Sequence, residues 1–313
     1  MRPTPFWRSA ISIGGELSLL PVVEHGPVYL SSGAFRDQTI QNTLELSRRW
    51  GVVNVELGSG IPFHADTLSL ISAEADNFNF LAHNYFPAPE EPFVLNLASL
   101  DDANLERSRA HCRHGLEITA QLGAPFYAAH AGYLFDPRPE ELGHVLNAPE
   151  TTTKDKCFNV FLESVSALLD FARSFGVGFL VENNVCAPFN APDGVNDKLL
   201  LTSPDEILEF AEALNAPDFG LLMDVGHLKV SAHTLGFDCD EAMTQLQHLI
   251  RAFHLSDNDG SADQNLGFSS DAWFLPWLGK IPSVPITIEA YNMNQDDYAQ
   301  CLAAIGQARP EGR

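Results

Sequence analysis

The chain has 313 residues, of which 45% are hydrophobic and 19% are charged, a composition typical of globular proteins large enough to bury a substantial core. Its 18 basic and 41 acidic residues give a formal net charge of −23 at pH 7. Such a charge repels phosphate backbones and anionic membranes over roughly 8–10 Å, and because the sequence has no local basic patch, we expect neither nucleic acid nor a membrane as a partner.

Eight short apolar runs alternate with longer segments of helical periodicity from residue 28 onward. In chain order, these runs predict strands over 28–35, 52–58, 78–86, 125–132, 178–184, 219–227, 251–258 and 285–292. Most of the runs are almost continuously apolar, which is typical of parallel strands buried on both faces. Among the helical segments, 157–175 has the clearest amphipathic pattern, and Gly176 follows it as a stop signal.

Eight strands that alternate with helices predict the α/β class and a (β/α)8 TIM barrel, because eight right-handed crossovers return the sheet to its first strand. The alternative is an open doubly wound sheet, which usually has a glycine-rich phosphate-binding turn after its first strand. The GAFRD segment at 33–37 is not such a turn. No linker divides the chain, so we predict a single barrel domain over 28–313, preceded by an N-terminal extension over 1–27.

The cysteines and the apolar segments indicate the cellular compartment of the protein. The five cysteines lie far apart and form no CxxC pair, which argues against a disulfide framework and against a cysteine zinc site. No apolar run reaches the roughly 18 residues that a membrane helix needs, and Glu16 interrupts the apolar stretch near the N-terminus, unlike a signal peptide. We expect a cytoplasmic protein that acts on a small molecule, and a homo-oligomer is compatible with these features.

Side chains that can bind metals recur at the C-terminal ends of the predicted strands. They are Glu56, His83, His130, Glu182, Asp224, His227, His254, Asp257 and Glu289. In a barrel these strand ends converge on one mouth, which is where barrel active sites lie. Because a buried lone carboxylate costs several kcal/mol, converging carboxylates need a cation or mutual pairing, and a divalent metal is the simplest compensation. The strongest set is Glu182, Asp224, His254 and Glu289, on strands five to eight.

The other members of the set each have a plain structural alternative. Glu56 is equally compatible with a carboxylate that caps a core layer and pairs with an arginine. Taken alone, His83 and His130 are more often hydrogen-bonded core histidines, and the neighbouring Asn84 and Tyr85 could satisfy His83. The joint occurrence of the four residues on strands five to eight, in contrast, is hard to produce by packing alone.

The four residues stand in the segments VENN, MDVGH, FHLSDNDG and IEAYN. Over roughly residues 28–305 the chain resembles the xylose-isomerase-like barrel superfamily, which includes sugar isomerases and epimerases and the endonuclease IV group. The resemblance implies that Glu182, Asp224, His254 and Glu289 hold one divalent ion, typically manganese, cobalt, magnesium or zinc. It also implies that Glu182 and Glu289 are an acid–base pair, as in the ketose 3-epimerases of this superfamily.

The same resemblance implies that His227, three residues after the aspartate, contacts the substrate. We predict a similar role for Asp257 in the His-x-x-Asp segment. Two positions depart from the ketose 3-epimerase pattern: Gly260 stands where an arginine is expected, and Pro188 stands where a second glutamate is expected. Both departures argue against assigning the chain to the ketose 3-epimerases specifically.

The segment 81–109 resembles endonuclease IV more closely, with a histidine–tyrosine strand end followed by an Asn-Leu-Ala-Ser turn. This resemblance implies that His83 and His130 hold a second ion, with Glu182 as the bridge. The third ion of that group needs an Asp-x-His pair, and this chain has Asp263 but Asn265 in the histidine position. Because a neutral amide is a poor zinc ligand, we expect one or two ions per chain.

Three functions remain compatible with these features. The preferred hypothesis is a metal-dependent isomerase or epimerase of a sugar or a related polyhydroxy carbonyl compound. The second is a di-metal phosphoesterase, similar to endonuclease IV, which the histidine pair His83 and His130 supports and which the charge of −23 opposes for duplex DNA. The third is a metal-stabilised binding protein without catalytic activity, for which we expect a filled barrel mouth.

Overall fold

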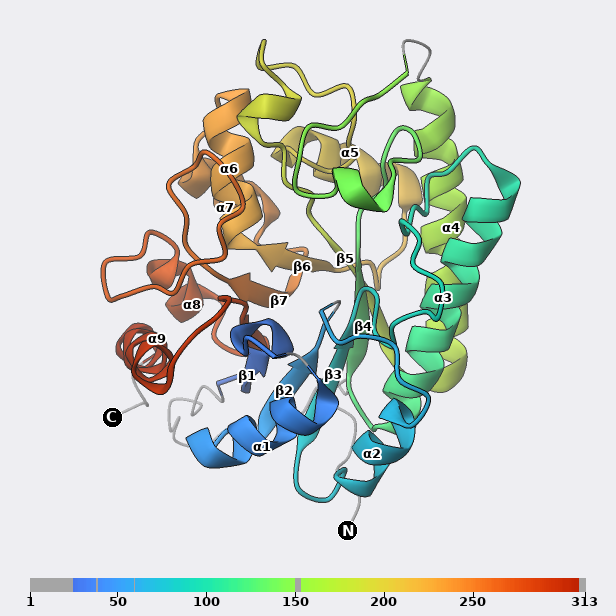
Figure 1. Ribbon diagram of the computed structural model, residues 1–313. Coiled ribbons are helices and arrows are strands. Elements are labelled where there is room, and N and C mark those ends of the chain that lie inside the picture. The colour runs from blue at the N-terminus through green and yellow to red at the C-terminus, as the bar shows by residue number, and fades with distance from the viewer. Residues whose placement is uncertain (1–24, 38, 59, 150–152, 310–313) are drawn as a thin grey trace, which may run out of the picture.

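The computed structural model describes residues 25–309 except 38, 59 and 150–152, and these residues form a closed barrel of eight parallel strands (Figure 1). The strands pair in chain order, and β8 closes the barrel against β1. Their bounds are β1 Val28–Ser31, β2 Asn54–Leu57, β3 Asn79–His83, β4 Phe126–His130, β5 Gly178–Glu182, β6 Leu221–Asp224, β7 Ile250–Leu255 and β8 Ile286–Ile288. The predicted TIM barrel is therefore confirmed, and every strand overlaps its predicted run. Most of the predicted N-terminal extension, residues 1–24, lies outside the described residues.

Helices follow the strands and surround the barrel (Figure 1). They are α1 Ile40–Trp50, α2 Thr67–Ala73, α3 Asp102–Gln121, α4 Lys154–Phe175, α5 Pro204–Leu214, α6 Val225–Leu235, α7 Cys239–Leu246, α8 Leu275–Lys280 and α9 Gln295–Ala308, with 3-10 turns η1 Ser32–Ala34, η2 Pro139–Glu141 and η3 Pro188–Asn190. Helix α4 ends where the sequence predicted it, directly before Gly176. This glycine adopts a left-handed conformation, φ 69°, that terminates the helix.

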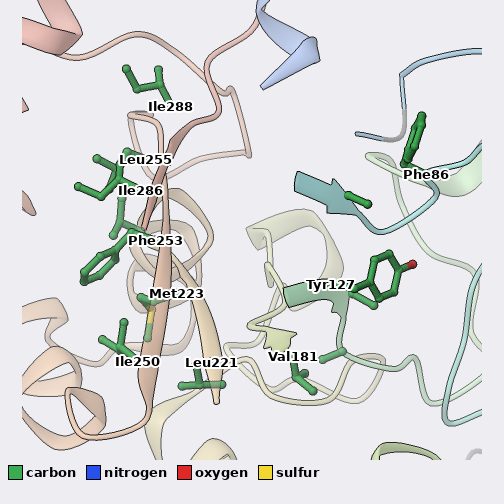
Figure 2. Close-up of a cluster of buried hydrophobic side chains, with 14 of the residues drawn as sticks. Phe86, Tyr127, Val181, Leu221, Met223, Ile250, Phe253, Leu255, Ile286 and Ile288 are labelled. Atoms are coloured by element: carbon green, nitrogen blue, oxygen red, sulfur yellow. The ribbon is translucent and has the colours of Figure 1, made fainter. Parts of the chain in front are cut away.

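The barrel strands have two different faces, because successive side chains of a strand point in opposite directions. One face packs against the surrounding helices in the main hydrophobic core, to which β6 and β7 contribute Met223 and Phe253 (Figure 2). The other face points into the barrel, where a smaller apolar cluster fills the interior. That inner cluster consists of Tyr29, Leu81, Ala124, Phe126, Ala128, Leu180, Leu222 and Ala252. The barrel is thus a packed core on both faces, and this packing holds the strand ends rigidly in place.

The cysteines and the helix lengths agree with what the sequence indicates. All five cysteines are free thiols, and four of them are buried in the core, so they form no disulfide framework. Among the residues that the structure describes, no helix is long and apolar enough to cross a membrane.

Candidate metal centre

The barrel interior changes from apolar to ionisable at the C-terminal ends of the strands. On β5, β6 and β7 the inner-cluster residues Leu180, Leu222 and Ala252 are followed two positions later by Glu182, Asp224 and His254. Because a strand repeats every two residues, these later side chains also point inward, one layer higher. Strand register brings them together, since Asp224 is the partner of His254 and His130 is the partner of Glu182.

A four-residue cluster, which we call the first cluster, consists of Glu182, Asp224, His254 and Glu289. One ligand atom from each residue lies within 4.8 Å of all the others. The Nδ1 atom of His254 lies 2.6 Å from Glu289 Oε2, 3.4 Å from Glu182 Oε1 and 3.9 Å from Asp224 Oδ2. Three of the four residues are fully buried, and Glu289 is 9% exposed, which places it on the open side of the cluster.

The first cluster contains polar atoms that the protein itself leaves unsatisfied. Glu182 Oε1 and Asp224 Oδ2 are buried and accept no hydrogen bond within the part of the chain that the structure describes, whereas His254 Nδ1 faces Glu289 Oε2 at 2.6 Å. A buried acceptor without a partner costs about 1–3 kcal/mol, more if it is charged. A divalent cation would satisfy these two oxygens and bind His254 Nδ1 as well, and oxygen and imidazole nitrogen donors suit manganese, cobalt, magnesium and zinc. The residues therefore fit a metal.

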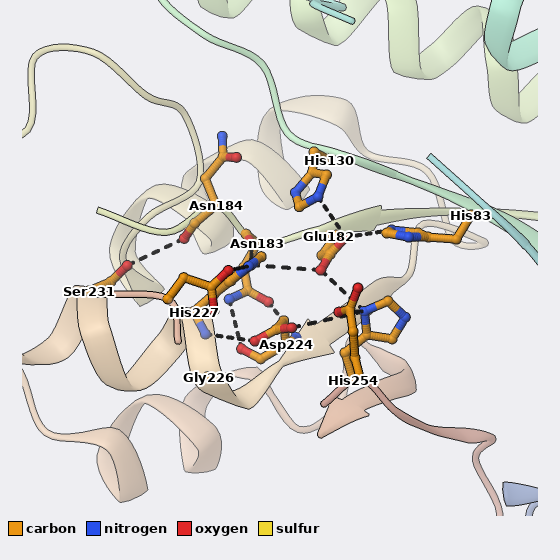
Figure 3. Close-up of polar contacts among 12 residues, drawn as sticks. His83, His130, Glu182, Asn183, Asn184, Asp224, Gly226, His227, Ser231 and His254 are labelled. Atoms are coloured by element: carbon orange, nitrogen blue, oxygen red, sulfur yellow. Dashed lines mark hydrogen bonds and ion pairs between the residues drawn. The ribbon is translucent and has the colours of Figure 1, made fainter. Parts of the chain in front are cut away.

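A second cluster shares Glu182 with the first and adds His83 and His130. Glu182 Oε2 lies 2.7 Å from His83 Nε2 and 3.5 Å from His130 Nε2 (Figure 3). The two oxygens of Glu182 thus face different clusters, Oε2 toward these histidines and Oε1 toward His254. His83 is satisfied by a carboxylate across the barrel and not by Asn84 or Tyr85, the alternative that the sequence suggested. The arrangement matches a carboxylate bridge between two cation sites.

Glu56 belongs to the same buried region, although its role differs from the sequence alternative. Its partner is not an arginine: Glu56 Oε2 lies 3.0 Å from His254 Nε2 and accepts a hydrogen bond from Thr287 Oγ1 at 3.0 Å. One ligand atom from each of Glu56, His83 and His254 lies within 4.8 Å of the other two. Glu56 therefore lies behind His254, on the side of the imidazole that faces away from the first cluster.

The pKa values show how strongly the buried charges act on one another. Burial raises the pKa of Glu182, but the nearby His130, His83 and His254 outweigh it and hold that pKa well below its usual range. Burial raises the pKa of Asp224 to about 7 despite the opposing charge of His227. Glu182 is therefore ionised near neutral pH, whereas Asp224 lacks enough positive charge around it to stay fully ionised. A cation in the first cluster would supply that charge.

The remaining histidine, His227, lies beside the clusters at the start of α6. Its Nδ1 donates to the backbone oxygen of Asn183 at 2.9 Å, and its Nε2 lies 3.4 Å from Asp263 Oδ2. Asn265 is buried in a left-handed conformation, φ 47°, and its backbone oxygen accepts from the Tyr291 amide. Within the described part of the chain, His227 does not belong to any group of three or more His, Cys, Asp or Glu side chains whose ligand atoms lie within 4.8 Å of one another. That the third ion site is impaired stays a prediction.

Asp257, for which we predict substrate contact, lies apart from both clusters. Its Oδ1 forms an ion pair with Lys229 Nζ at 2.7 Å, and its backbone pairs with Leu266 in a short antiparallel bridge. The structure therefore joins Asp257 to α6 through Lys229 rather than to the four ligands. Its role as a substrate contact stays a prediction.

The sequence reasoning missed Asn183, which positions two of the candidate site residues. Its side-chain oxygen accepts from the Asp224 amide at 2.8 Å, and its side-chain nitrogen donates to the Asp224 carbonyl at 3.0 Å. Its backbone oxygen receives the hydrogen bond from His227 (Figure 3). The signal was its place directly after Glu182, because residues that follow a strand-end ligand sit at the barrel mouth.

Comparison with known proteins agrees with this architecture. The family model described as xylose isomerase-like TIM barrel matches residues 44–300. The chain belongs to that family. The matched xylose isomerase-like region contains every residue of both clusters as well as Glu56, so the resemblance that the sequence motifs indicated is confirmed. No curated protein matches the chain in sequence.

Several solved structures share the xylose isomerase-like fold. A D-tagatose 3-epimerase-like protein is 18% identical with a TM-score of 0.69, over 90% of this chain and 96% of that one. A D-psicose 3-epimerase with D-tagatose, from Clostridium cellulolyticum, is 14% identical with a TM-score of 0.62, over 91% and 99%. A Thermus thermophilus protein soaked with zinc chloride is 19% identical with a TM-score of 0.61, over 93% and 100%. At these identities the likeness establishes the fold.

Proposed function

We propose that the protein is a metal-dependent isomerase or epimerase of a sugar or a related small polyhydroxy carbonyl compound. The observation that carries the proposal is the first cluster: three carboxylates and one histidine converge at the barrel mouth, and two of the buried carboxylate oxygens have no hydrogen-bond partner among the described residues. Membership of the xylose isomerase-like family supports it, as do fold neighbours whose names are those of sugar epimerases.

In this proposal Glu182 and Glu289 exchange protons with the carbon next to the substrate carbonyl. Glu182 is able to accept a proton because the surrounding histidines keep its carboxylate ionised. Glu289, the more exposed member of the cluster, would return a proton from the open side. A divalent ion, when bound by the first cluster, supplies Lewis-acid stabilisation of negative charge that develops on the substrate oxygens. The other ligands, Asp224 and His254, would hold that ion.

The substitution Glu182→Gln tests the proposal, because it keeps the size of the side chain and removes its ability to accept a proton. We expect turnover of the best substrate from a panel of ketoses and aldoses to fall by at least about 10²–10⁴-fold, the usual contribution of general acid–base catalysis. Turnover is measured by chromatography of the products, and by uptake of solvent deuterium at the carbon next to the carbonyl. Circular dichroism checks that the variant is folded.

Glu212→Gln on the exposed surface of α5 is the matched control, and we expect it to retain full activity. Because Glu182 is also a proposed ligand, the metal content of each variant is measured in parallel by elemental analysis. A Glu182→Gln protein that keeps its metal and loses turnover supports proton transfer by this residue. Full activity in the same variant would rule the mechanism out.

A second candidate function, hydrolysis of phosphoesters at a di-metal site, is favoured by the second cluster. His83 and His130 meet the bridging carboxylate of Glu182, and an isomerase with one metal has no need for this pair. Two ions about 3.5–4 Å apart can activate water and hold a leaving oxygen. Two tightly held ions per chain together with hydrolysis of a generic phosphodiester would favour this function, whereas one exchangeable ion with sugar conversion would favour the isomerase.

A further inference from the structure

Glu56 is a buried carboxylate on β2 that neither proposed reaction uses. It is 1% exposed, and its backbone neighbours in the sheet are Ser31 on β1 and Leu81 on β3. Among the described residues no lysine or arginine forms an ion pair with it; its ion-pair partner is His254, at 3.0 Å. Its location in the barrel interior deprives the carboxylate of water, so keeping it ionised there costs several kcal/mol unless its partners compensate.

The contacts of Glu56 are arranged unevenly between its two oxygens. Oε2 receives both the His254 imidazole and the Thr287 hydroxyl, each at 3.0 Å, whereas Oε1 has no hydrogen-bond partner among the described residues. A residue that served only to join β2 to its neighbours would use both oxygens, because an unsatisfied buried acceptor destabilises the fold. The arrangement therefore favours a role that depends on Oε2 and its contact with His254.

The contact with Glu56 determines which nitrogen of His254 is free. An ionised carboxylate can only accept hydrogen bonds, so the Nε2 atom that faces Glu56 must carry the proton. When His254 is neutral, as a histidine must be to bind a metal, its lone pair is then on Nδ1, the atom that lies 2.6 Å from Glu289 and 3.4 Å from Glu182. Ligand histidines commonly donate their second nitrogen to a carboxylate, which fixes the tautomer and makes the ligand nitrogen more basic.

We propose that Glu56 is a positioning residue that turns the Nδ1 lone pair of His254 toward the first cluster and so increases the affinity of that cluster for a divalent ion. Thr287 completes the arrangement by orienting the Glu56 carboxylate through its hydroxyl. The inference rests on the metal site of the proposed function, but it does not depend on the substrate or on the reaction. It extends the site from the four ligands to a chain of contacts across β8, β2 and β7.

The experiment measures Co²⁺ affinity, with the full-length protein freed of metal and titrated against a competing chelator. Glu56→Gln keeps the size of the side chain and removes its charge, so we expect Co²⁺ to bind about 10–100-fold more weakly, the usual effect of losing an outer partner of a ligand histidine. If two ions bind, the loss is expected at one step only. The absorption bands of bound Co²⁺ should also shift, because the histidine donor changes its basicity.

Two further variants separate positioning from general stability. Thr287→Val leaves the Glu56 charge in place and removes only the orienting hydroxyl, so we expect a smaller loss of Co²⁺ affinity than in Glu56→Gln. Glu212→Gln, on the surface of α5, should bind Co²⁺ as the unaltered protein does. Unfolding of each metal-free variant in urea shows whether the fold is retained.

The outcomes distinguish this inference from the proposed function. If the unaltered protein binds Co²⁺ and Glu56→Gln binds it equally well, Glu56 does not position His254 and the inference is wrong, while the proposed function stands. If Glu56→Gln loses Co²⁺ affinity only in proportion to a loss of metal-free stability, the residue is structural and the inference is again wrong. If the unaltered protein binds no Co²⁺, the metal site fails, and the proposed function fails with it.

Discussion

The inner and outer faces of the barrel strands differ in composition although they alternate within the same short segments. On β6 the outward Met223 packs in the main core, and the next residue, Asp224, points inward to the first cluster. On β7 the same alternation places Phe253 outside and His254 inside. Each strand end thus supplies one side chain that stabilises the fold and a neighbouring one that is available for chemistry.

Because of this alternation, fold stability and metal binding depend on different, adjacent residues of the same strand. The outer side chains gain free energy by leaving water and touching apolar neighbours. The inner side chains at the mouth lose free energy by leaving water, and they recover it through one another or through a cation. Substitutions on the two faces should therefore have opposite effects on stability and on metal affinity, and measuring both quantities for each variant tests whether the two faces are independent.

The largest effect on stability is expected for Met223→Ala, because Met223 is fully buried on the outer face of β6. Removing such a side chain and leaving a cavity typically lowers the free energy of unfolding by about 2–5 kcal/mol. We expect this loss in urea unfolding of the metal-free protein. The dissociation constant for Co²⁺ should stay nearly the same, since the ligand atoms on the inner face keep their positions. A large loss of metal affinity at full stability would contradict the separation of the two faces.

The neighbouring substitution Asp224→Asn should have the opposite signature. Metal affinity should fall by more than about 100-fold, because loss of an outer partner alone costs about 10–100-fold. The stability of the metal-free protein should rise, since an amide avoids the cost of a buried charge and still accepts the hydrogen bond from the His227 amide that begins α6.

The pH dependence of that gain follows from the pKa of Asp224, which is about 7 in the fold and 3.8 in its ordinary state. The protonated carboxyl is the stable form in the fold, so stability is fully present below pH 3.8 and is lost as the pH rises toward 7 and beyond. Asp224→Asn should therefore stabilise the metal-free protein more at about pH 8 than at about pH 4. Equal stabilisation at both pH values would mean that Asp224 does not carry the buried charge.

The sequence predicted the outer face better than the contacts within the inner one. Apolar runs depend on local spacing, so all eight strands could be located from the chain alone. The convergence of Glu182, Asp224 and His254 followed from the fold, because parallel strand ends meet at one mouth. The partner of Glu56 could not be predicted in this way, since His254 lies 198 positions away and only barrel closure brings its Nε2 within 3.0 Å of the carboxylate. The ion pair between Asp257 and Lys229 could not be predicted from the sequence either.

The two faces of the barrel also differ in how they affect the pKa of a histidine. His111 on α3 lies outside the barrel, and its Nε2 donates to the Asn84 backbone oxygen at 3.1 Å. Burial lowers the pKa of His111 to about 4, and the nearby His114 and Arg107 act in the same direction. The inner His254 is buried as well, but Glu56, Glu289 and Glu182 outweigh burial and raise its pKa well above the usual range. Surroundings, and not burial alone, set the charge of each histidine.

The lowered pKa of His111 predicts how the stability of the metal-free protein depends on pH. Above pH 6.5 the ring is neutral in both states; as the pH falls toward 4 only the unfolded chain takes up the proton, so stability is lost in this window. His111→Gln, whose amide can still donate to Asn84, should remove this contribution. Between about pH 7.5 and about pH 4.5 the unaltered protein should lose about 2 kcal/mol more than the variant, at about 1.4 kcal/mol per pKa unit and with some screening by water. Urea unfolding at the two pH values measures the difference, and parallel losses in both proteins would show that His111 is not held neutral by burial.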